Sequence, residues 1–175
     1  MSQNTNKPAA GKPLARFNVT NLDGTQRTLV EPSSRWTLLI VYRGKHCGRC
    51  KKYLNVLESM KEQWDAAGFD IIAVSADSIE KATDDVKEFG WTFPIAAQLQ
   101  EADMRSLGLY ISDPLTPDET DKRFAEPAVF CLRPDTSVQI AAISNGPSAR
   151  PDLAELLDGM IFTITHEKPA RGMVV

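Results

Sequence analysis

Two cysteines of this 175-residue chain stand three residues apart, in the tetrapeptide Cys47-Gly48-Arg49-Cys50. A thiolate attacks disulfide sulfur or peroxide oxygen, and a second thiol one helical turn away can close a disulfide ring with little backbone movement. The other neighbours of the pair are mostly basic: Lys45, His46, Lys51 and Lys52. Because no acidic residue occurs between Arg43 and Asn55, we expect the local positive charge to lower the pKa of a thiol here.

A close cysteine pair is also half of a tetrahedral zinc site, which would need two further ligands. The remaining candidates are His46, His166 and Cys131. His166 lies near the C-terminus, and Cys131 lies inside an apolar run that predicts a buried strand, so we expect no metal site and a packed core thiol at Cys131. A metal-binding module and a non-catalytic redox sensor remain alternatives to an enzyme.

The cysteine pair lies between a predicted strand and a predicted helix. Residues 37–42 form a nearly unbroken apolar run, which is typical of a strand buried on both faces. After the pair, large apolar residues recur at spacings of three and four: Tyr53, Leu57, Met60 and Trp64. This spacing predicts a helix that ends near Gly68. The first turn of such a helix offers unpaired N–H groups and a partial positive charge, which favour a thiolate.

The rest of the chain alternates between strand and helix patterns. We expect one domain over residues 14–172, preceded by a flexible arm at residues 1–13. The predicted elements are a hairpin over 17–29 with its turn at Asp23-Gly24, strands over 70–75, 93–97, 128–132 and 138–143, and helices over 79–90, 101–109 and 153–164. Residues 110–125 are predicted to form a long loop at the rim of the cysteine site. The pattern predicts a mixed α/β sheet with helices on both faces.

Composition excludes several function classes. Hydrophobic residues make up 42% and charged residues 25%, as in ordinary globular domains. The 20 basic and 23 acidic residues give a net charge of −3, which argues against a general nucleic-acid binder and a polybasic membrane anchor. The polar first residues do not resemble a secretory signal, and no run of 18 apolar residues occurs, so we expect a cytoplasmic protein.

Several segments together resemble a known family: residues 41–50, 72–76, 127–130, 150–153 and 169–172. In these segments the chain is similar to the peroxiredoxin-like proteins of the alkyl hydroperoxide reductase/thiol-specific antioxidant family. The resemblance implies a thioredoxin-like fold with a mixed central sheet flanked by helices, an N-terminal β-hairpin and a C-terminal helix. It also implies a thiol-dependent antioxidant oxidoreductase that reduces peroxides or disulfides and takes electrons from an external thioredoxin- or glutathione-type thiol. The sulfurs carry the electrons, so no cofactor is expected, and the resemblance allows self-association.

Two family patterns assign the cysteines differently. The peroxiredoxin pattern Pro-x-x-x-Thr/Ser-x-x-Cys places Arg43 at the proline, Cys47 at the hydroxyl residue and Cys50 at the peroxidatic position. The thioredoxin pattern makes Cys47 the exposed nucleophile, Cys50 the resolving partner and Pro127 the cis-proline opposite them. His46 would tune the thiol pKa or shuttle a proton. The first nucleophile remains open at this point, with Arg43, His46, Arg49 and Pro127 as supporting residues.

Overall fold

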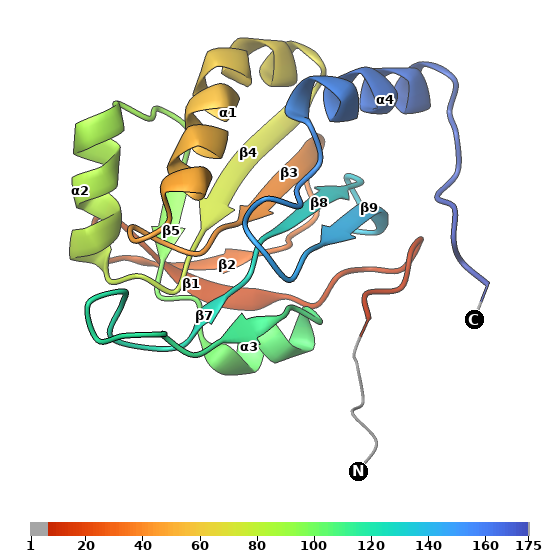
Figure 1. Ribbon diagram of the computed structural model, residues 1–175. Helices are drawn as coiled ribbons and strands as arrows, with labels where there is room; N and C mark the ends of the chain where they lie inside the picture. The colour runs from red at the N-terminus through yellow and green to blue at the C-terminus, as the bar shows by residue number, and fades with distance from the viewer. Residues whose placement is uncertain (1–6, 175) are drawn as a thin grey trace.

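The computed structural model describes residues 7–174, and its centre is a seven-stranded sheet in the order β2-β1-β5-β4-β3-β8-β9 (Figure 1). The elements along the chain are β1 (Phe17–Asn21), β2 (Gln26–Leu29), β3 (Trp36–Val41), α1 (Gly48–Ala66), β4 (Phe69–Val74), α2 (Ile79–Phe89), β5 (Ile95–Ala97), α3 (Glu101–Ser106), β6 (Ile111–Ser112), β7 (Phe124–Ala125), β8 (Ala128–Leu132), β9 (Val138–Ile143) and α4 (Leu153–Thr165). β3 runs parallel to β4 and antiparallel to β8, and β1 pairs antiparallel with β5. The sheet is therefore mixed, as expected.

Successive residues of β3 enter two different cores, because side chains alternate across a strand. Leu38 and Ile40 join the core that α1, α2 and α4 cover. Leu39 and Val41 join a second core, which contains Met104 of α3. Figure 1 shows the same layers, with α1, α2 and α4 above the sheet and α3 below it. This arrangement explains why the apolar run of β3 is unbroken.

The helix boundaries follow the expected capping signals. Cys47 is the N-cap of α1, and Gly68, which follows the C-cap Ala67, has a φ of 91°. The Ser78 side chain accepts a hydrogen bond from Lys81 N at the start of α2, and Gly90 ends α2 with a φ of 69°. Glycine adopts this left-handed conformation without steric cost. The predicted starts and ends of these two helices are therefore confirmed.

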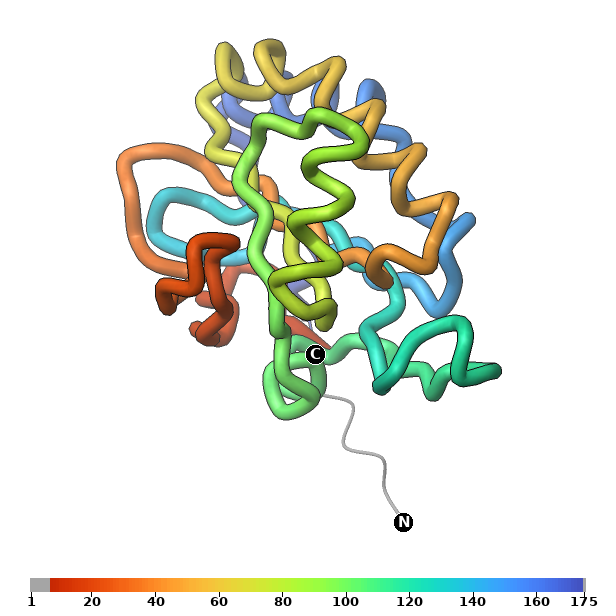
Figure 2. The backbone as a smooth tube through the Cα atoms, turned by 90° about the vertical axis from the view of Figure 1, so that its left-hand side faces the viewer, coloured from red at the N-terminus to blue at the C-terminus, as the bar shows by residue number. Residues whose placement is uncertain are grey.

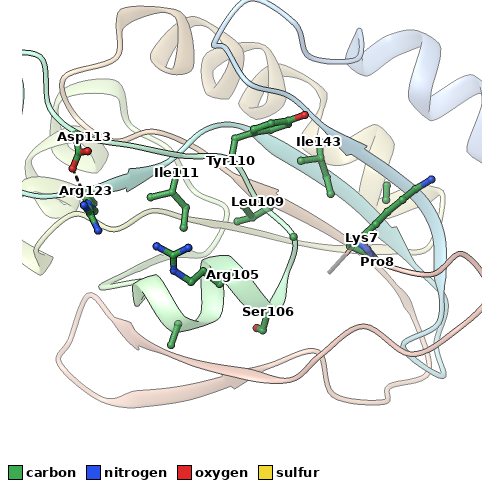
Figure 3. A pocket seen from close by; sticks show the side chains of 13 residues that line it. Lys7, Pro8, Arg105, Ser106, Leu109, Tyr110, Ile111, Asp113, Arg123 and Ile143 are labelled. Atoms are coloured by element: carbon green, nitrogen blue, oxygen red, sulfur yellow. Dashed lines mark hydrogen bonds and ion pairs between the residues drawn. The ribbon is translucent and has the colours of Figure 1, made fainter. Parts of the chain in front are cut away.

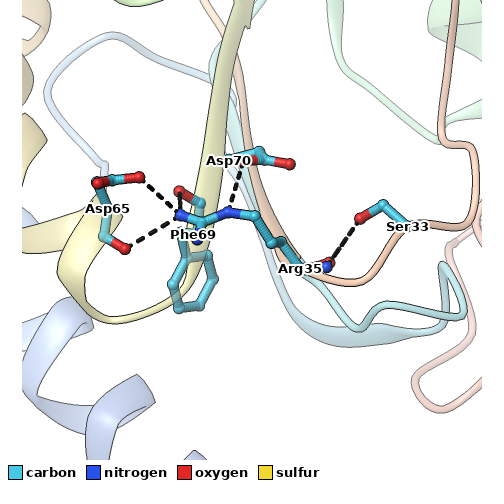
Figure 4. A network of polar contacts seen from close by, with 5 residues as sticks. All are labelled: Ser33, Arg35, Asp65, Phe69 and Asp70. Atoms are coloured by element: carbon cyan, nitrogen blue, oxygen red, sulfur yellow. Dashed lines mark hydrogen bonds and ion pairs between the residues drawn. The ribbon is translucent and has the colours of Figure 1, made fainter.

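Arg35 fastens β3 to the C-terminal end of α1 and the start of β4 (Figure 4). Its Nη2 donates to the carbonyl and Oδ1 of Asp65 at 3.0 and 2.8 Å and to Phe69 O at 2.9 Å. Its Nε donates to Asp70 Oδ1 at 2.8 Å. These bonds fix the strand and helix at the end opposite to Cys47.

The predicted loop over residues 110–125 is wrong at both of its ends. β6 and β7 pair antiparallel, with Ile111 opposite Ala125 and Ser112 opposite Phe124, so only residues 113–123 connect them without regular structure. Phe124 and Ala125 are buried. Strands of two residues carry almost no periodic signal, so the acidic and proline-rich segment between them masked the pairing.

The expected cis-proline is also wrong. Within residues 7–174 there is no cis peptide bond, so the Glu126–Pro127 bond is trans. Glu126 N donates to Tyr110 O at 2.8 Å, and Ser144 N donates to Pro127 O at 3.0 Å. The extended chain thus passes directly from β7 into β8, and Pro127 precedes a strand, a position that suits a residue without an N–H.

Of the predicted N-terminal arm, residues 1–6 lie outside the described part of the chain. Gly11 N donates to Val138 O at 2.8 Å, and Val138 N donates to Lys12 O at 3.0 Å. Leu14 N donates to Thr136 O at 3.1 Å. These bonds place residues 11–14 against the beginning of β9. No helix between residues 7 and 174 has both the length and the apolar character needed to cross a bilayer.

Candidate active site

The two neighbouring cysteines lie where β3 gives way to α1. Cys47 Sγ accepts a hydrogen bond from Cys50 N at 3.3 Å, and Cys47 N donates to Gly44 O at 3.0 Å. Both thiols are free and both residues are buried, with 3% of Cys47 and 0% of Cys50 exposed, so the expectation that Cys47 is exposed is wrong. A helix N-cap side chain normally accepts from this position, so the sulfur of Cys47 takes the place of the usual oxygen.

Gly44 and Asp77 set the course of the chain into Cys47. Gly44 has a φ of 129°, and a Cβ there would lie 2.7 Å from both carboxylate oxygens of Asp77. Asp77 Oδ2 accepts a hydrogen bond from Lys45 N at 2.7 Å. Burial raises the pKa of the Asp77 carboxyl. The turn therefore requires both a residue without a side chain and a buried acceptor three residues beyond the end of the parallel strand β4.

The two thiols differ sharply in acidity. The hydrogen bond from the Cys50 thiol, helped by Cys50 N and the Arg43 guanidinium, lowers the pKa of Cys47 to about 5 against the opposing effect of burial. The same hydrogen bond and burial raise the pKa of Cys50. Of the two thiols, Cys47 is therefore the one that ionises first. The predicted acidification holds for one cysteine of the pair only.

The basic neighbours contribute less to this acidification than the sequence suggests, because α2 supplies acids to them. Lys45 Nζ lies 2.7 Å from Asp84 Oδ2, and Lys51 Nζ lies 3.4 Å from Asp85 Oδ1. Arg49 is exposed to solvent. Of the predicted basic residues, Arg43 is the one whose charge acts directly on Cys47.

Arg43 and His46 lie against one aromatic ring. The Arg43 guanidinium carbon is 4.8 Å from the centre of the Phe124 ring, and the His46 ring meets the same ring edge-on at 4.6 Å. Burial and the Arg43 charge lower the pKa of His46. Both His46 nitrogens are buried without a hydrogen-bond partner among residues 7–174. A neutral imidazole with unused donor and acceptor capacity therefore lies next to Cys47.

Two glutamates face Arg43. Glu126 Oε2 is 3.2 Å from Arg43 Nε, and Glu119 Oε1 is 3.5 Å from Arg43 Nη2. Sequence reasoning placed Glu119 on a loop at the rim of the site but did not single out Glu126 or Asp77. Asp77 could have been found, because the carboxyl ends of neighbouring parallel strands meet at one edge of a sheet. Glu126 has no comparable signal.

The remaining predicted residues lie at different distances from the thiols. Pro127 precedes Ala128, which pairs with Val41 at the end of β3 where the cysteine loop begins. Cys131 lies in β8, and burial raises its pKa to about 12, which confirms a packed core thiol. Arg150 stacks over the Tyr53 ring at 4.5 Å, and its charge opposes the raised pKa of Cys50.

A cavity of about 1160 Å³ lies elsewhere, between α3, β6 and β9, and contains neither cysteine of the pair (Figure 3). Its arginines are paired with acids: Arg105 Nη2 lies 2.5 Å from Glu101, and Arg123 Nε lies 2.7 Å from Asp113. Across the described chain, no three His, Cys, Asp or Glu side chains gather as a metal site would require.

Comparison with known proteins identifies related chains. The profile of the AhpC/TSA family matches residues 10–141. The thiol-disulfide oxidoreductase ResA of Bacillus cereus is 28% identical over 110 residues, which cover 62% of this chain and 61% of ResA. The chain thus spans about three fifths of the length of this curated relative.

Two solved structures share the fold. Peroxidoxin BcpB from Mycobacterium tuberculosis is 18% identical, with a TM-score of 0.73 over 90% of this chain and 98% of that chain. AhpC from the same organism is 15% identical, with a TM-score of 0.73 over 93% of this chain and 96% of that chain. These likenesses confirm the expected thioredoxin-like fold with its mixed sheet, N-terminal hairpin and C-terminal helix.

Proposed function

Because the chain belongs to the AhpC/TSA family, we propose that it is a thiol-dependent oxidoreductase in which Cys47 and Cys50 exchange two electrons with a peroxide or a disulfide. The observation that carries this proposal is the unequal pair of free thiols at the start of α1. Cys47 is the acidic sulfur, and Cys50 lies one turn further along the helix. The family and its thiol-disulfide oxidoreductase relative support the same redox chemistry.

Cys47 is the first nucleophile in this proposal. A thiolate reacts and a thiol does not. Cys50, at the position that peroxiredoxins use for peroxide, is fully buried and has a raised pKa. The thioredoxin-type order of the two sulfurs therefore fits the site better than the peroxiredoxin-type order.

With a disulfide, the Cys47 thiolate attacks one sulfur and the other sulfur leaves as a thiolate, which forms a mixed disulfide. Cys50 then loses its proton and attacks Cys47 Sγ, so the second substrate thiolate leaves and the Cys47–Cys50 disulfide forms. With a peroxide, Cys47 becomes a sulfenic acid as the O–O bond breaks, and attack by Cys50 releases water. An external thiol donor of the thioredoxin or glutathione type reduces the pair again.

The neighbouring residues support these steps. Arg43 stabilises the Cys47 thiolate, and the neutral His46 accepts or delivers the proton that moves with each thiol exchange. The exposed Arg49 adds positive charge between the two cysteines in the chain, and Pro127 leads into β8, which pairs with the end of β3 before the cysteine loop. A reducing compartment such as the cytoplasm suits a chain that needs its thiols free. Family membership also suggests self-association.

The order of the two sulfurs is tested with single substitutions in the full chain. Cys47→Ser is expected to abolish the reduction of both a dithiobis-nitrobenzoate disulfide and hydrogen peroxide. Cys50→Ser is expected to complete the first attack and to accumulate a mixed disulfide or a sulfenic acid, which mass spectrometry detects. Cys131→Ala serves as the control that removes a thiol outside the site. If Cys50→Ser loses the first attack on peroxide and Cys47→Ser keeps it, the proposed order is wrong.

A further inference from the structure

The Arg43 side chain acts on the reactive thiol through a hydrogen bond and its positive charge, yet its other neighbours are acidic or aromatic. Its side chain is 17% exposed, and it lies between the Phe124 ring, Glu119 and Glu126. Its buried Nε has no well-aligned acceptor in the described chain, although Glu126 is 3.2 Å away. In such a poorly solvated place, each added or removed charge acts strongly on its neighbours. One guanidinium is thus shared between two carboxylates and a thiolate.

The two carboxylates are held differently. Glu126 has a side chain that is 6% exposed, and its Oε1 accepts a hydrogen bond from Ser112 Oγ at 2.7 Å. It lies between β7 and β8 and belongs to the fixed frame of the site. Glu119 is 19% exposed and belongs to the loop over residues 113–123. Its position relative to Arg43 depends on that loop.

The loop itself is anchored mainly by exposed contacts. Glu119 Oε2 accepts a hydrogen bond from Leu115 N at 2.7 Å, which folds the loop on itself. Asp121 pairs with Lys81 of α2 at 2.6 Å, and Asp121 is 73% exposed. In Figures 1 and 2 the loop runs beside the segment that leads from β3 into α1. A solvent-facing segment therefore places one carboxylate against the arginine that controls the active thiol.

We propose that Glu119 is a positioning residue that sets the reactivity of Cys47 by holding part of the Arg43 charge away from the thiolate. When Glu119 is neutral or displaced, the Arg43 guanidinium interacts more strongly with Cys47 Sγ. The thiolate is then more stable, leaves more readily from a disulfide and attacks more slowly once fully ionised. Because the loop is at the surface, a protein that docks on it and moves Glu119 would shift the redox balance of the pair. This inference uses the proposed function only in taking Cys47 as the nucleophile.

Other charged groups also face Cys47, so the test must isolate Glu119. Cys50 on α1 and Arg43 and His46 before the helix act on Cys47 directly, whereas Asp77 acts on His46 and Glu126 pairs with Arg43. Glu119→Gln removes the charge but keeps an oxygen that can accept from Leu115 N. Asp118→Asn is the matched control, because Asp118 is an exposed acid on the same loop.

The measurement is the rate of iodoacetamide alkylation of reduced full-length protein from about pH 3.5 to about pH 9, a range that lies on both sides of the Cys47 pKa. Glu119→Gln is expected to alkylate Cys47 about three- to tenfold faster than the wild type below the thiol pKa, since one pKa unit is about a tenfold change in ionisation. Above that pKa the variant is expected to be slower, because nucleophilicity falls with thiol pKa. Glutathione redox equilibrium is expected to shift toward the dithiol form by a similar factor.

The outcomes separate the possible errors. If Asp118→Asn gives the same change as Glu119→Gln, or if neither variant changes the profile, the inference is overturned. A change in Glu119→Ala without a change in Glu119→Gln points to loop opening rather than charge and also overturns it. The alkylation profile needs no substrate. A protein that shows the crossover but never forms the Cys47–Cys50 disulfide refutes the proposed function and leaves this inference standing.

Discussion

Arg35 and Arg43 lie at the two ends of β3 and are bound in opposite ways. Arg35 directs its Nε and Nη2 to acceptors at 2.8 to 3.0 Å, namely Asp65, Phe69 O and Asp70. The carboxylates around Arg43 are 3.2 and 3.5 Å away, and its Nε has no aligned partner among the described residues. Both Nε and Nη2 of the first arginine are hydrogen-bonded, and Nε of the second is not.

The same contrast extends to the neighbours of Arg43. The Tyr42 hydroxyl, both His46 nitrogens and both Asp85 carboxylate oxygens are buried without a hydrogen-bond partner within residues 7–174. Buried polar groups are nearly always paired in native proteins, so a cluster of unpaired ones is costly. Trp64 Nε1, toward the other end of α1, is also buried and unpaired in the described chain, so the clearest contrast is between the two arginines: Arg35 is hydrogen-bonded to three residues, and Arg43 Nε has no aligned partner. Four substitutions or measurements test this distinction.

The largest effect is expected from Gly44→Ala. The new Cβ would lie 2.7 Å from the Asp77 carboxylate oxygens, in a backbone conformation that residues with side chains rarely adopt. We expect the free energy of unfolding to fall by about 2 kcal/mol, with alkylation of Cys47 slowed by roughly tenfold or more through loss of the N-cap geometry. Urea unfolding and iodoacetamide alkylation measure the two effects.

Gly48→Ala is the control for this substitution. Gly48 begins α1, and a Cβ there would meet nothing within 4 Å. It is expected to leave both measurements near their wild-type values. Equal behaviour of Gly44→Ala and Gly48→Ala would show that the turn tolerates a side chain and that Asp77 does not define it.

The next largest effect is expected from Arg43→Met, which keeps much of the side-chain volume and removes the charge. Because Arg43 lowers the pKa of Cys47, the loss should raise that pKa and slow alkylation at pH 5 by about three- to tenfold. The rates should converge at high pH, where Cys47 is ionised in both proteins. Arg43→Lys keeps the charge, and we expect it to restore part of the difference. An unchanged pH profile in Arg43→Met would remove the functional contrast with Arg35.

A smaller effect is expected on how the free energy of unfolding depends on pH. The pKa of Cys47 is about 5 in the folded chain and near its ordinary value of about 8.5 when unfolded. Between these values the unfolded chain binds more protons than the folded chain, so the stability of the reduced protein rises with pH across this window. The contribution is lost as the pH falls through about 5. The raised pKa of Cys50 acts only above the ordinary thiol pKa, where the unfolded thiol ionises first.

Chemical denaturation of the reduced wild type and of Cys47→Ser between pH 5 and pH 8 tests this linkage, since that window of about three pH units lies between the two pKa values. The difference in unfolding free energy between the two proteins is expected to grow with pH in favour of the wild type. Parallel pH dependences would mean that Cys47 is protonated in the folded state.

The smallest effect on the thiols is expected from Arg35→Met. Loss of its partly exposed hydrogen bonds should lower the free energy of unfolding by about 1 kcal/mol. The pH profile of Cys47 alkylation should stay unchanged, because Arg35 lies at the other end of β3. A shift of that profile would show that the two arginines are not functionally distinct.

Sequence patterns alone predicted the local frame of the site. The apolar run of β3, the cysteine pair and the helical spacing after it are contiguous, and the strand, the cap and the first turn depend on residues a few positions apart. Periodicity therefore placed α1, α2 and α4 close to their observed bounds. Cys131 was assigned to the core for the same reason, since alternation along β8 is a local property.

Tertiary structure decided what surrounds that frame. The pairing of β6 with β7, the trans bond before Pro127 and the approach of Asp77, Glu119 and Glu126 to the cysteine loop all depend on contacts across the fold. The lysines near the thiols also contribute less to the acidity of the pair than the sequence suggests, because Asp84 and Asp85 of α2 pair with Lys45 and Lys51. By itself the sequence determined that two thiols meet at a helix start. Only the folded geometry of the cysteine loop determined which of them is the thiolate, because the hydrogen bonds from Cys50 and the effect of the Arg43 charge depend on how these groups are placed in space.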